Sequence, residues 1–215
     1  YDWLKDGAPY RMMENTHVWE DGNNDEVAIL KIYPQVTLAF ESGKYLYIGS
    51  TGSGDAGALQ ADSVTFTSVD SASTWSQIRM RTYSRDDLTE LNHCIIENAV
   101  DGIYCESSSP TITNSTIRNN TDGIEANSGS QPTITGNTFT GNTRPVSIYA
   151  NRIDSTIYGN TYSGNTKDYI EVQGDYIEDD RTIVWALDNS PYVVVGDVYV
   201  RRSNNSSQLS TLQIA

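Results

Sequence analysis

Four oxygen-bearing residues near the N-terminus are the best candidates for metal binding. A hard cation such as calcium prefers carboxylate and amide oxygens. The segment Glu20–Glu26 (EDGNNDE) supplies them around one glycine, from Asp21, Asn23, Asp25 and Glu26. A solvated acidic loop is the competing interpretation. We favour it because the corresponding positions in a second, C-terminal copy of this region, Ser203, Asn205 and Ser207, carry no charge.

Two carboxylate pairs and two histidines are the candidates for acid–base chemistry. Paired carboxylates serve as acid and base in glycosidases, and this chain has Asp86-Asp87 and Asp179-Asp180. Adjacent strand residues point to opposite faces, so we interpret both pairs as solvated turns. His17 and His93 are far apart in sequence, and no G-x-S-x-G or C-x-x-C motif occurs. We therefore assign no catalytic residue.

Tyr45 and Tyr47 are the candidates for contact with a glycan. They flank Leu46, so they should face outward if Leu46 and Ile48 face the core. Exposed aromatic rings can stack on sugars, although tyrosines on a sheet also stack on one another for stability. Both interpretations stay open.

The amino-acid composition indicates which kind of secondary structure must position these residues. Among 215 residues there are 23 Ser, 22 Thr and 17 Asn but only 4 Lys and 10 Leu, which favours strands and turns over helices. The net charge of −14 argues against nucleic acid as a partner. The sequence has no apolar run long enough for membrane insertion.

A short repeat organises the middle of the chain. Similar segments begin at Leu91, Ile112, Ile134 and Ile157, so the period is roughly 22 residues. Apolar residues recur in fixed columns; one contains Ile103, Ile124, Val146 and Tyr169. Asparagines recur as well, and stacked asparagines can satisfy backbone groups at bends. We expect a structural ladder from Asn120, Asn142, Asn165, Asn137 and Asn160.

The segment Ile112–Ile124 (ITNSTIRNNTDGI) resembles the right-handed parallel β-helix repeats of the pectate-lyase-like superfamily. The resemblance covers about residues 88–175 and implies an all-β solenoid of roughly nine coils of about 22 residues. That superfamily includes polysaccharide lyases and hydrolases, so the resemblance also admits a carbohydrate-active enzyme. Signatures such as G-H-G and R-I-K are absent from this sequence.

A second, longer repeat aligns Trp3–Ile32 with Trp185–Ile214 without gaps. Eight of the 30 positions are identical: Trp3/Trp185, Asp6/Asp188, Pro9/Pro191, Tyr10/Tyr192, Val18/Val200, Asn23/Asn205, Leu30/Leu212 and Ile32/Ile214. We therefore expect one β-helix module in residues 1–182 and the start of a related module in residues 183–215. The segment Pro34–Phe40 (PQVTLAF), which follows the first copy, resembles the entry of β-helix modules in secreted and surface proteins, with Gln35 in place of the usual Gly.

These patterns favour a non-catalytic structural or adhesive module that stacks head to tail into a rod or filament. The expected partners are other copies or adjacent modules, with polysaccharide as an alternative ligand, and the expected location is extracellular or on the cell surface. The alternative function is a carbohydrate-active enzyme or a glycan-binding module. No cofactor other than calcium is suggested. Cys94 and Cys105, the only cysteines, are interpreted as buried thiols, with a disulfide as the alternative.

Overall fold

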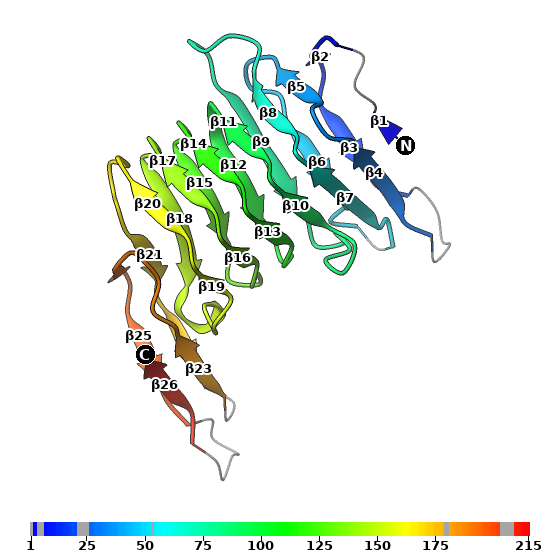
Figure 1. The fold of residues 1–215 in the computed structure, drawn as a ribbon. Coiled ribbons are helices and arrows are strands. Elements are labelled where there is room, and N and C mark those ends of the chain that lie inside the picture. Colours follow the sequence, from blue (N-terminus) through cyan, green and yellow to red (C-terminus); the bar gives the residue numbers. More distant parts are fainter. Residues whose placement is uncertain (1, 4–6, 21–25, 53, 179–180, 203–208) are drawn as a thin grey trace.

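The chain folds into a solenoid of short parallel strands, shown by a computed structural model (Figure 1). The structure describes residues 2–3, 7–20, 26–52, 54–178, 181–202 and 209–215. Successive strands from β1 to β21 lie in turn on three sheets, called A, B and C, so each coil contributes one strand to each sheet. The expectation of a parallel β-helix is confirmed.

Each of the three sheets is a row of parallel strands in spatial order. Sheet A contains β1 (Asp2–Trp3), β4 (Ala28–Ile32), β7 (Gly57–Asp62), β10 (Glu90–Asn92), β13 (Thr111–Thr113), β16 (Thr133–Thr135) and β19 (Ile157–Tyr158). Sheet B contains β2 (Tyr10–Met12), β5 (Thr37–Phe40), β8 (Thr65–Ser68), β11 (Ile95–Glu97), β14 (Thr116–Arg118), β17 (Thr138–Thr140) and β20 (Thr161–Ser163). Sheet C contains β3 (Thr16–Val18), β6 (Leu46–Ile48), β9 (Trp75–Met80), β12 (Ala99–Cys105), β15 (Asp122–Ala126), β18 (Arg144–Tyr149), β21 (Ile170–Gln173) and β24 (Tyr192–Val194).

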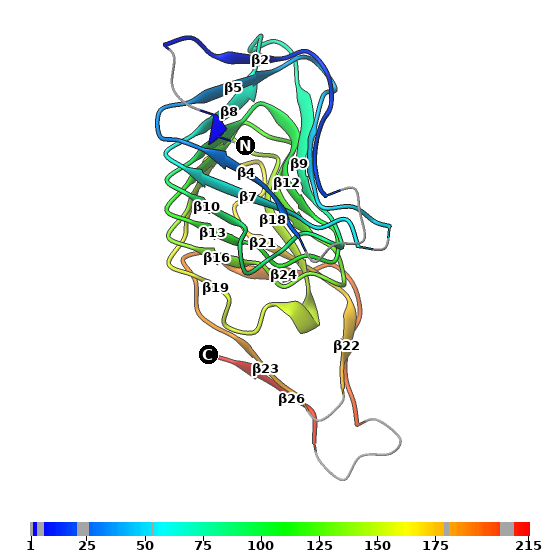
Figure 2. The same ribbon diagram turned by 90° about the vertical axis from the view of Figure 1, so that its right-hand side faces the viewer.

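Two small sheets complete the C-terminal end. Sheet D pairs β22 (Asp175–Ile177) with β25 (Val198–Val200), and sheet E pairs β23 (Thr182–Trp185) with β26 (Thr211–Ile214). Figure 2 shows β22, β23 and β26 extending beyond the outline of the coils formed by sheets A, B and C. In the described part of the chain, helix is confined to the short turn Ala150–Arg152, so no helical segment reaches membrane-spanning length.

The core consists of apolar side chains stacked in register between the three sheets. In sheet B, Ile96 pairs with Ile117, and Ile117 pairs with Phe139. The Phe139 ring stacks on Tyr162 with 5.1 Å between ring centroids. Ile117 and Phe139 are fully buried, and burying a side chain of this size stabilises the fold by about 1.5–3 kcal/mol.

One predicted core position is wrong by one residue. The expected column placed Tyr169 beside Val146, but Val146 pairs with Ile170, which is fully buried. Tyr169 is only half-buried and lies beside Lys167, whose Nζ is 5.9 Å from the ring centroid. The connection before β21 is one residue longer than the repeat pattern predicts, so the side-chain alternation moves Ile170 inward.

Coil length is regular only in the second half of the solenoid. Gln60 pairs with Glu90, and Glu90 pairs with Thr111, so the step along the chain is clearly longer in the first case than in the second. The expected spacing of about 22 residues therefore describes the coils from β10 to β25, whereas the earlier coils and the step from β23 to β26 have longer connections. Gln35 adopts a φ of 69°, the left-handed conformation that glycine favours, so its turn keeps the geometry expected of the usual Gly.

Candidate functional site

The predicted asparagine ladder forms two buried columns at the bends of the coils. In the first column, the Oδ1 atom of Asn160 accepts the backbone N–H of Asn137 at 2.9 Å, and Asn137 does the same for Ser115 at 2.9 Å. In the second, Asn165 accepts from Asn142 at 3.0 Å, and Asn142 accepts from Asn120 at 3.0 Å. The five asparagines therefore hold the coils together and are not available for a ligand.

A left-handed residue precedes each ladder position and makes the bend. The first column is preceded by His93, Asn114, Gly136 and Gly159, and the second by Asn98, Asn119, Gly141 and Gly164, all with φ between 50° and 68°. Gly, Asn and His are the residues that tolerate this conformation best. His93 is thus a bend residue, with its Nδ1 atom 3.3 Å from Asp62 Oδ1.

The outer face of sheet C carries a cluster of aromatic and basic side chains. Tyr45 and Tyr47 stack with 3.7 Å between ring centroids, and His17 packs edge-on against both at 5.5 Å. Burial, and the positive charge of Arg81, lower the pKa of His17. The aromatic–basic cluster, as we call it, comprises His17, Trp19, Tyr45, Tyr47, Arg79, Arg81 and Tyr104.

Leu46 and Ile48 are fully buried, so Tyr45 and Tyr47 face outward as predicted. The Arg79 guanidinium carbon lies 5.7 Å from the ring centroid of Tyr47 and 4.8 Å from that of Tyr104. Cations near aromatic faces are attracted to the ring electrons. The result is a surface with both aromatic rings and positive charge.

A carboxylate–arginine network continues on the same face of sheet C. Arg144 makes two bonds to Asp122, at 2.7 and 2.9 Å, and further bonds to Glu125 at 2.9 Å and Glu171 at 2.7 Å. Asp101 completes the group, because one oxygen each from Asp101, Asp122 and Glu125 lie within 4.8 Å of one another. Arg144 already supplies a positive charge to Asp122 and Glu125, so we assign no metal ion here.

Asp101 is the unusual member of this network. Burial, reinforced by the negative charges of Glu125 and Asp122, raises its pKa from 3.8 to about 6. Asp101 therefore exchanges its proton near pH 6, and its neighbour Asp122 lies 2.7 Å from Arg144. A carboxyl group that can hold a proton next to ionised ones is able to act as a general acid.

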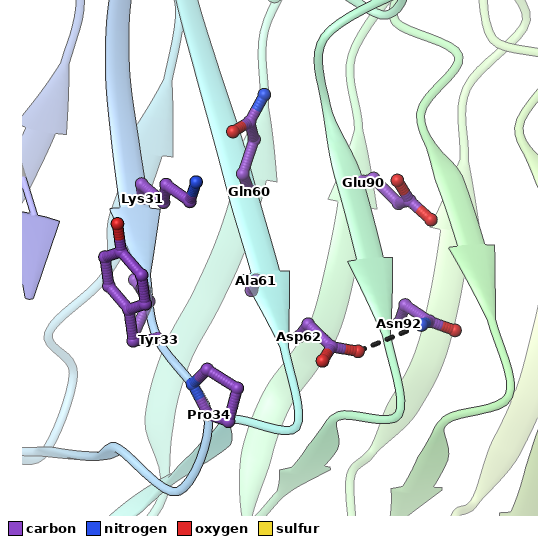
Figure 3. Close-up of a pocket in the computed structure, with 9 residues that line it drawn as sticks. Lys31, Tyr33, Pro34, Gln60, Ala61, Asp62, Glu90 and Asn92 are labelled. Atoms are coloured by element: carbon purple, nitrogen blue, oxygen red, sulfur yellow. Dashed lines mark hydrogen bonds between the residues drawn. The ribbon is translucent and has the colours of Figure 1, made fainter. Parts of the chain in front are cut away.

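The outer face of sheet A has a shallow groove of about 430 Å³ (Figure 3). Its base is formed by β4, β7 and β10, and Lys31, Gln60 and Glu90 project from these strands in one row. Asn92 donates to Asp62 at 2.9 Å, as the dashed line in Figure 3 shows. The Lys31 Nζ atom lies 5.2 Å from the Tyr33 ring centroid, so the groove is polar and its charges are partly engaged.

The carboxylate pair Asp86-Asp87 is split by the fold. Asp87 is exposed and pairs with Arg85 at 2.9 Å, whereas burial raises the pKa of Asp86. The two carboxylates therefore do not face a common site. The other pair, Asp179-Asp180, lies outside the described residues.

The predicted calcium ligands remain a prediction. Asp21, Asn23 and Asp25 lie outside the described residues, and Glu26 is exposed. Nothing in the described part of the chain tests this loop as a cation site.

The family model for the right-handed beta helix region matches residues 51–190. The chain belongs to the right-handed β-helix family. No curated protein and no solved structure shows significant similarity to it. The family membership establishes the fold and its hand, and the expectation drawn from Ile112–Ile124 is confirmed.

In this right-handed β-helix both cysteines are free and buried. Burial raises the pKa of Cys94 to about 12 and also raises that of Cys105. Thiolates are the reactive form of cysteine, so neither residue is a candidate nucleophile.

Sequence reasoning missed the residues that organise the outer surface and the ladder ends of this β-helix. Arg144 was not singled out, because its partners Asp122 and Glu171 lie 22 and 27 residues away. Asp168 and Asp188, which accept the last hydrogen bonds of the two asparagine columns, were also missed. The identity of Asp188 with Asp6 in the long repeat was the one available signal.

Proposed function

We propose that this right-handed β-helix is a non-catalytic structural module that assembles head to tail into a rod or filament, outside the cell or on its surface. The observation that supports it most is the exposure of apolar side chains on β24, β25 and β26. Val194, Val200 and Ile214 on these strands are 49%, 47% and 71% exposed. Apolar side chains gathered on one surface favour contact with another protein.

The backbone of the same coil is suited to continued stacking. Among the described residues, β24, β25 and β26 are each the last strand of their sheet. An edge strand presents N–H and C=O groups to a further strand, and each described coil already pairs in parallel with its neighbour. A coil of the same kind would cover the apolar residues and extend the sheets together.

Sedimentation velocity over a series of protein concentrations tests this proposal, with negative-stain electron microscopy of the same samples. We expect species that grow with concentration in the range of about 1–100 µM, typical of a modest interface, and end-to-end particles. Val200→Asp should reduce assembly, whereas Val100→Asp, at an exposed valine on β12, should leave it unchanged. Strict monomers throughout would contradict the proposal. Samples with and without calcium also test the loop at Asp21–Glu26.

A second candidate function is polysaccharide binding or cleavage on the outer face of sheet C. The aromatic–basic cluster and Asp101, with its raised pKa, lie on the same sheet and favour it. Release of reducing ends from a panel of polysaccharides tests cleavage, and affinity electrophoresis tests binding. Tyr47→Ala should weaken binding, whereas Tyr158→Ala, at an exposed tyrosine on sheet A, should not. Equal retention of both variants would contradict this function.

A further inference from the structure

The strands at the two ends of the solenoid repeat each other with one offset. The shift in number that relates Trp3 to Trp185 also converts β2 (Tyr10–Met12) into β24 (Tyr192–Val194) and β3 (Thr16–Val18) into β25 (Val198–Val200). The pairing register is also repeated, because Trp3 pairs with Ile32 and Trp185 pairs with Ile214. The N-terminal and C-terminal coils therefore repeat these strand positions and this register, although β24 continues sheet C whereas β2 begins sheet B.

The identical residues at the start of this repeat contact the coil before them, as the C-terminal copy shows. Trp185 donates from Nε1 to the carbonyl oxygen of Ala150 at 2.9 Å. Asp188 accepts from Asn160, and Tyr192 pairs with Ile170. By the sequence alignment, the equivalent positions of the N-terminal copy are Trp3, Asp6 and Tyr10.

The identical residues at the end of the repeat contact the coil after them, as the N-terminal copy shows. Val18 pairs with Ile48, Leu30 with Leu59 and Ile32 with Ala61. Val18 and Ile32 are only 8% and 2% exposed there, because β6 and β7 cover them. Their counterparts Val200 and Ile214 are 47% and 71% exposed. The two copies thus show complementary contacts, the C-terminal copy with the coil before it and the N-terminal copy with the coil after it.

We propose, resting on the head-to-tail assembly above, that two copies join by sharing one such coil. Strands β24, β25 and β26 of one copy stay paired with their own β21, β22 and β23 and also cover β5–β7 of a second copy. Strands β2, β3 and β4 of the second copy leave that position. Because the two coils repeat strand positions and one pairing register, the incoming coil replaces the interactions of the displaced one with similar ones, as in domain swapping.

This joint has a defined register. Within one copy, Arg11 on β2 pairs with Ala39 on β5. Val193 occupies the position equivalent to Arg11, so Val193 of one copy should lie beside Ala39 of the next. In a single copy β24 and β5 lie at opposite ends of the solenoid (Figure 2), so a link between them must join two molecules.

Disulfide trapping tests the joint in the full chain. The double variant Val193→Cys with Ala39→Cys should form cross-linked dimers and longer species on mild oxidation, because paired positions in neighbouring strands have suitable geometry. Val193→Cys with Thr67→Cys, which lies one coil further along sheet B, is the matched control and should not cross-link. The unaltered chain, whose two thiols are buried, controls for background.

The possible outcomes distinguish a failure of coil sharing from a failure of head-to-tail assembly. Cross-linking of Val193→Cys with Arg11→Cys instead would mean that the two terminal coils stack directly, and would overturn coil sharing. Oligomers in sedimentation without the Val193–Ala39 link would also overturn it while leaving head-to-tail assembly intact. Monomers alone would contradict the assembly itself. Linked peptides identified by mass spectrometry at positions 193 and 39 would establish the joint.

Discussion

Asp188 closes the asparagine column that ends at Asn160. Its carboxylate accepts the backbone N–H of Asn160 at 3.0 Å and the side-chain amide of the same residue at 3.0 Å. Asp188 is only 6% exposed and also accepts from the Tyr162 hydroxyl at 2.9 Å. The regular coils therefore end on a buried carboxyl group that replaces the next asparagine.

Removal of this group should destabilise the C-terminal end of the solenoid. Asp188→Ala leaves buried donors of Asn160 and Tyr162 without an acceptor, and we expect a loss of about 2–4 kcal/mol in the free energy of unfolding. Asp188→Asn keeps one acceptor oxygen and should cost less. Urea unfolding measures both. The control is Asp168→Ala, which removes the equivalent but exposed acceptor of Asn165 and should cost less than Asp188→Ala.

Asn142 should be the most sensitive position in the second column. Its side chain accepts from Asn120 and donates to the carbonyl oxygen of Ile117 and to Asn165, and it is fully buried. We expect Asn142→Ala to cost about 3–5 kcal/mol. Asn119→Gly, at the exposed left-handed residue of the same column, should stay within about 0.5 kcal/mol. Similar losses in both variants would argue against a stabilising ladder.

A second variant at this position, Asn142→Asp, should make the stability of the protein depend on pH. At neutral pH the new carboxylate faces the oxygens of Ile117 and Asn165, so a buried charge lacks donors on one side. Protonation restores a donor, and the variant should regain stability as the pH falls. Thermal unfolding at several pH values checks this, and a pH-independent deficit would contradict it.

Asp101 should make the protein less stable at neutral than at acidic pH. Its pKa in the folded state, about 6, lies above the ordinary 3.8, so the folded state binds the proton more tightly. Its stabilising contribution is therefore present below about pH 4 and is lost as the pH rises to about 6. Asp101→Asn should gain about 1–2 kcal/mol at pH 7, after allowance for partial exposure.

Chemical unfolding of this variant and the parent at pH 4, 5, 6 and 7 measures the difference. The gain should grow with pH and level off above the pKa of Asp101. Glu106→Gln, at a carboxylate paired with Arg79 on the same sheet, is the matched control and should lose stability at pH 7. Loss of stability in Asp101→Asn would contradict the assignment.

Both thiols should be unreactive in the folded protein. Cys94 and Cys105 are buried, and burial raises the pKa of each, so little thiolate is present near neutral pH. A thiol reagent should therefore label neither residue in buffer and both in denaturant. Rapid labelling of the native protein would show that the coils around β12 open readily.

Much of the regular solenoid was predictable from residue spacing. Leu46 and Ile48 were expected inside and Tyr45 and Tyr47 outside, because successive residues of a strand alternate between its faces. The asparagine columns followed from the repeat, because parallel coils stack like residues in register at a fixed separation. Contacts between neighbouring coils are thus encoded by local periodicity.

The features that residue spacing did not predict depend on the lengths of connections and on contacts between residues far apart in sequence. One additional residue before β21 moved Ile170 into the column expected for Tyr169, because a shift of one residue reverses side-chain direction. Arg144 meets Glu171 across 27 residues, and periodicity does not specify where such side chains turn on the surface.

The two terminal coils show the same division between local pattern and three-dimensional arrangement. The shared residues of Trp3–Ile32 and Trp185–Ile214 were visible in the sequence, and so was their apolar character. Which apolar residues are buried depends on the neighbouring coil, since burial is a property of contacts and not of residue type. Ile32 is covered by β7, whereas the identical Ile214 on the last strand of sheet E remains exposed.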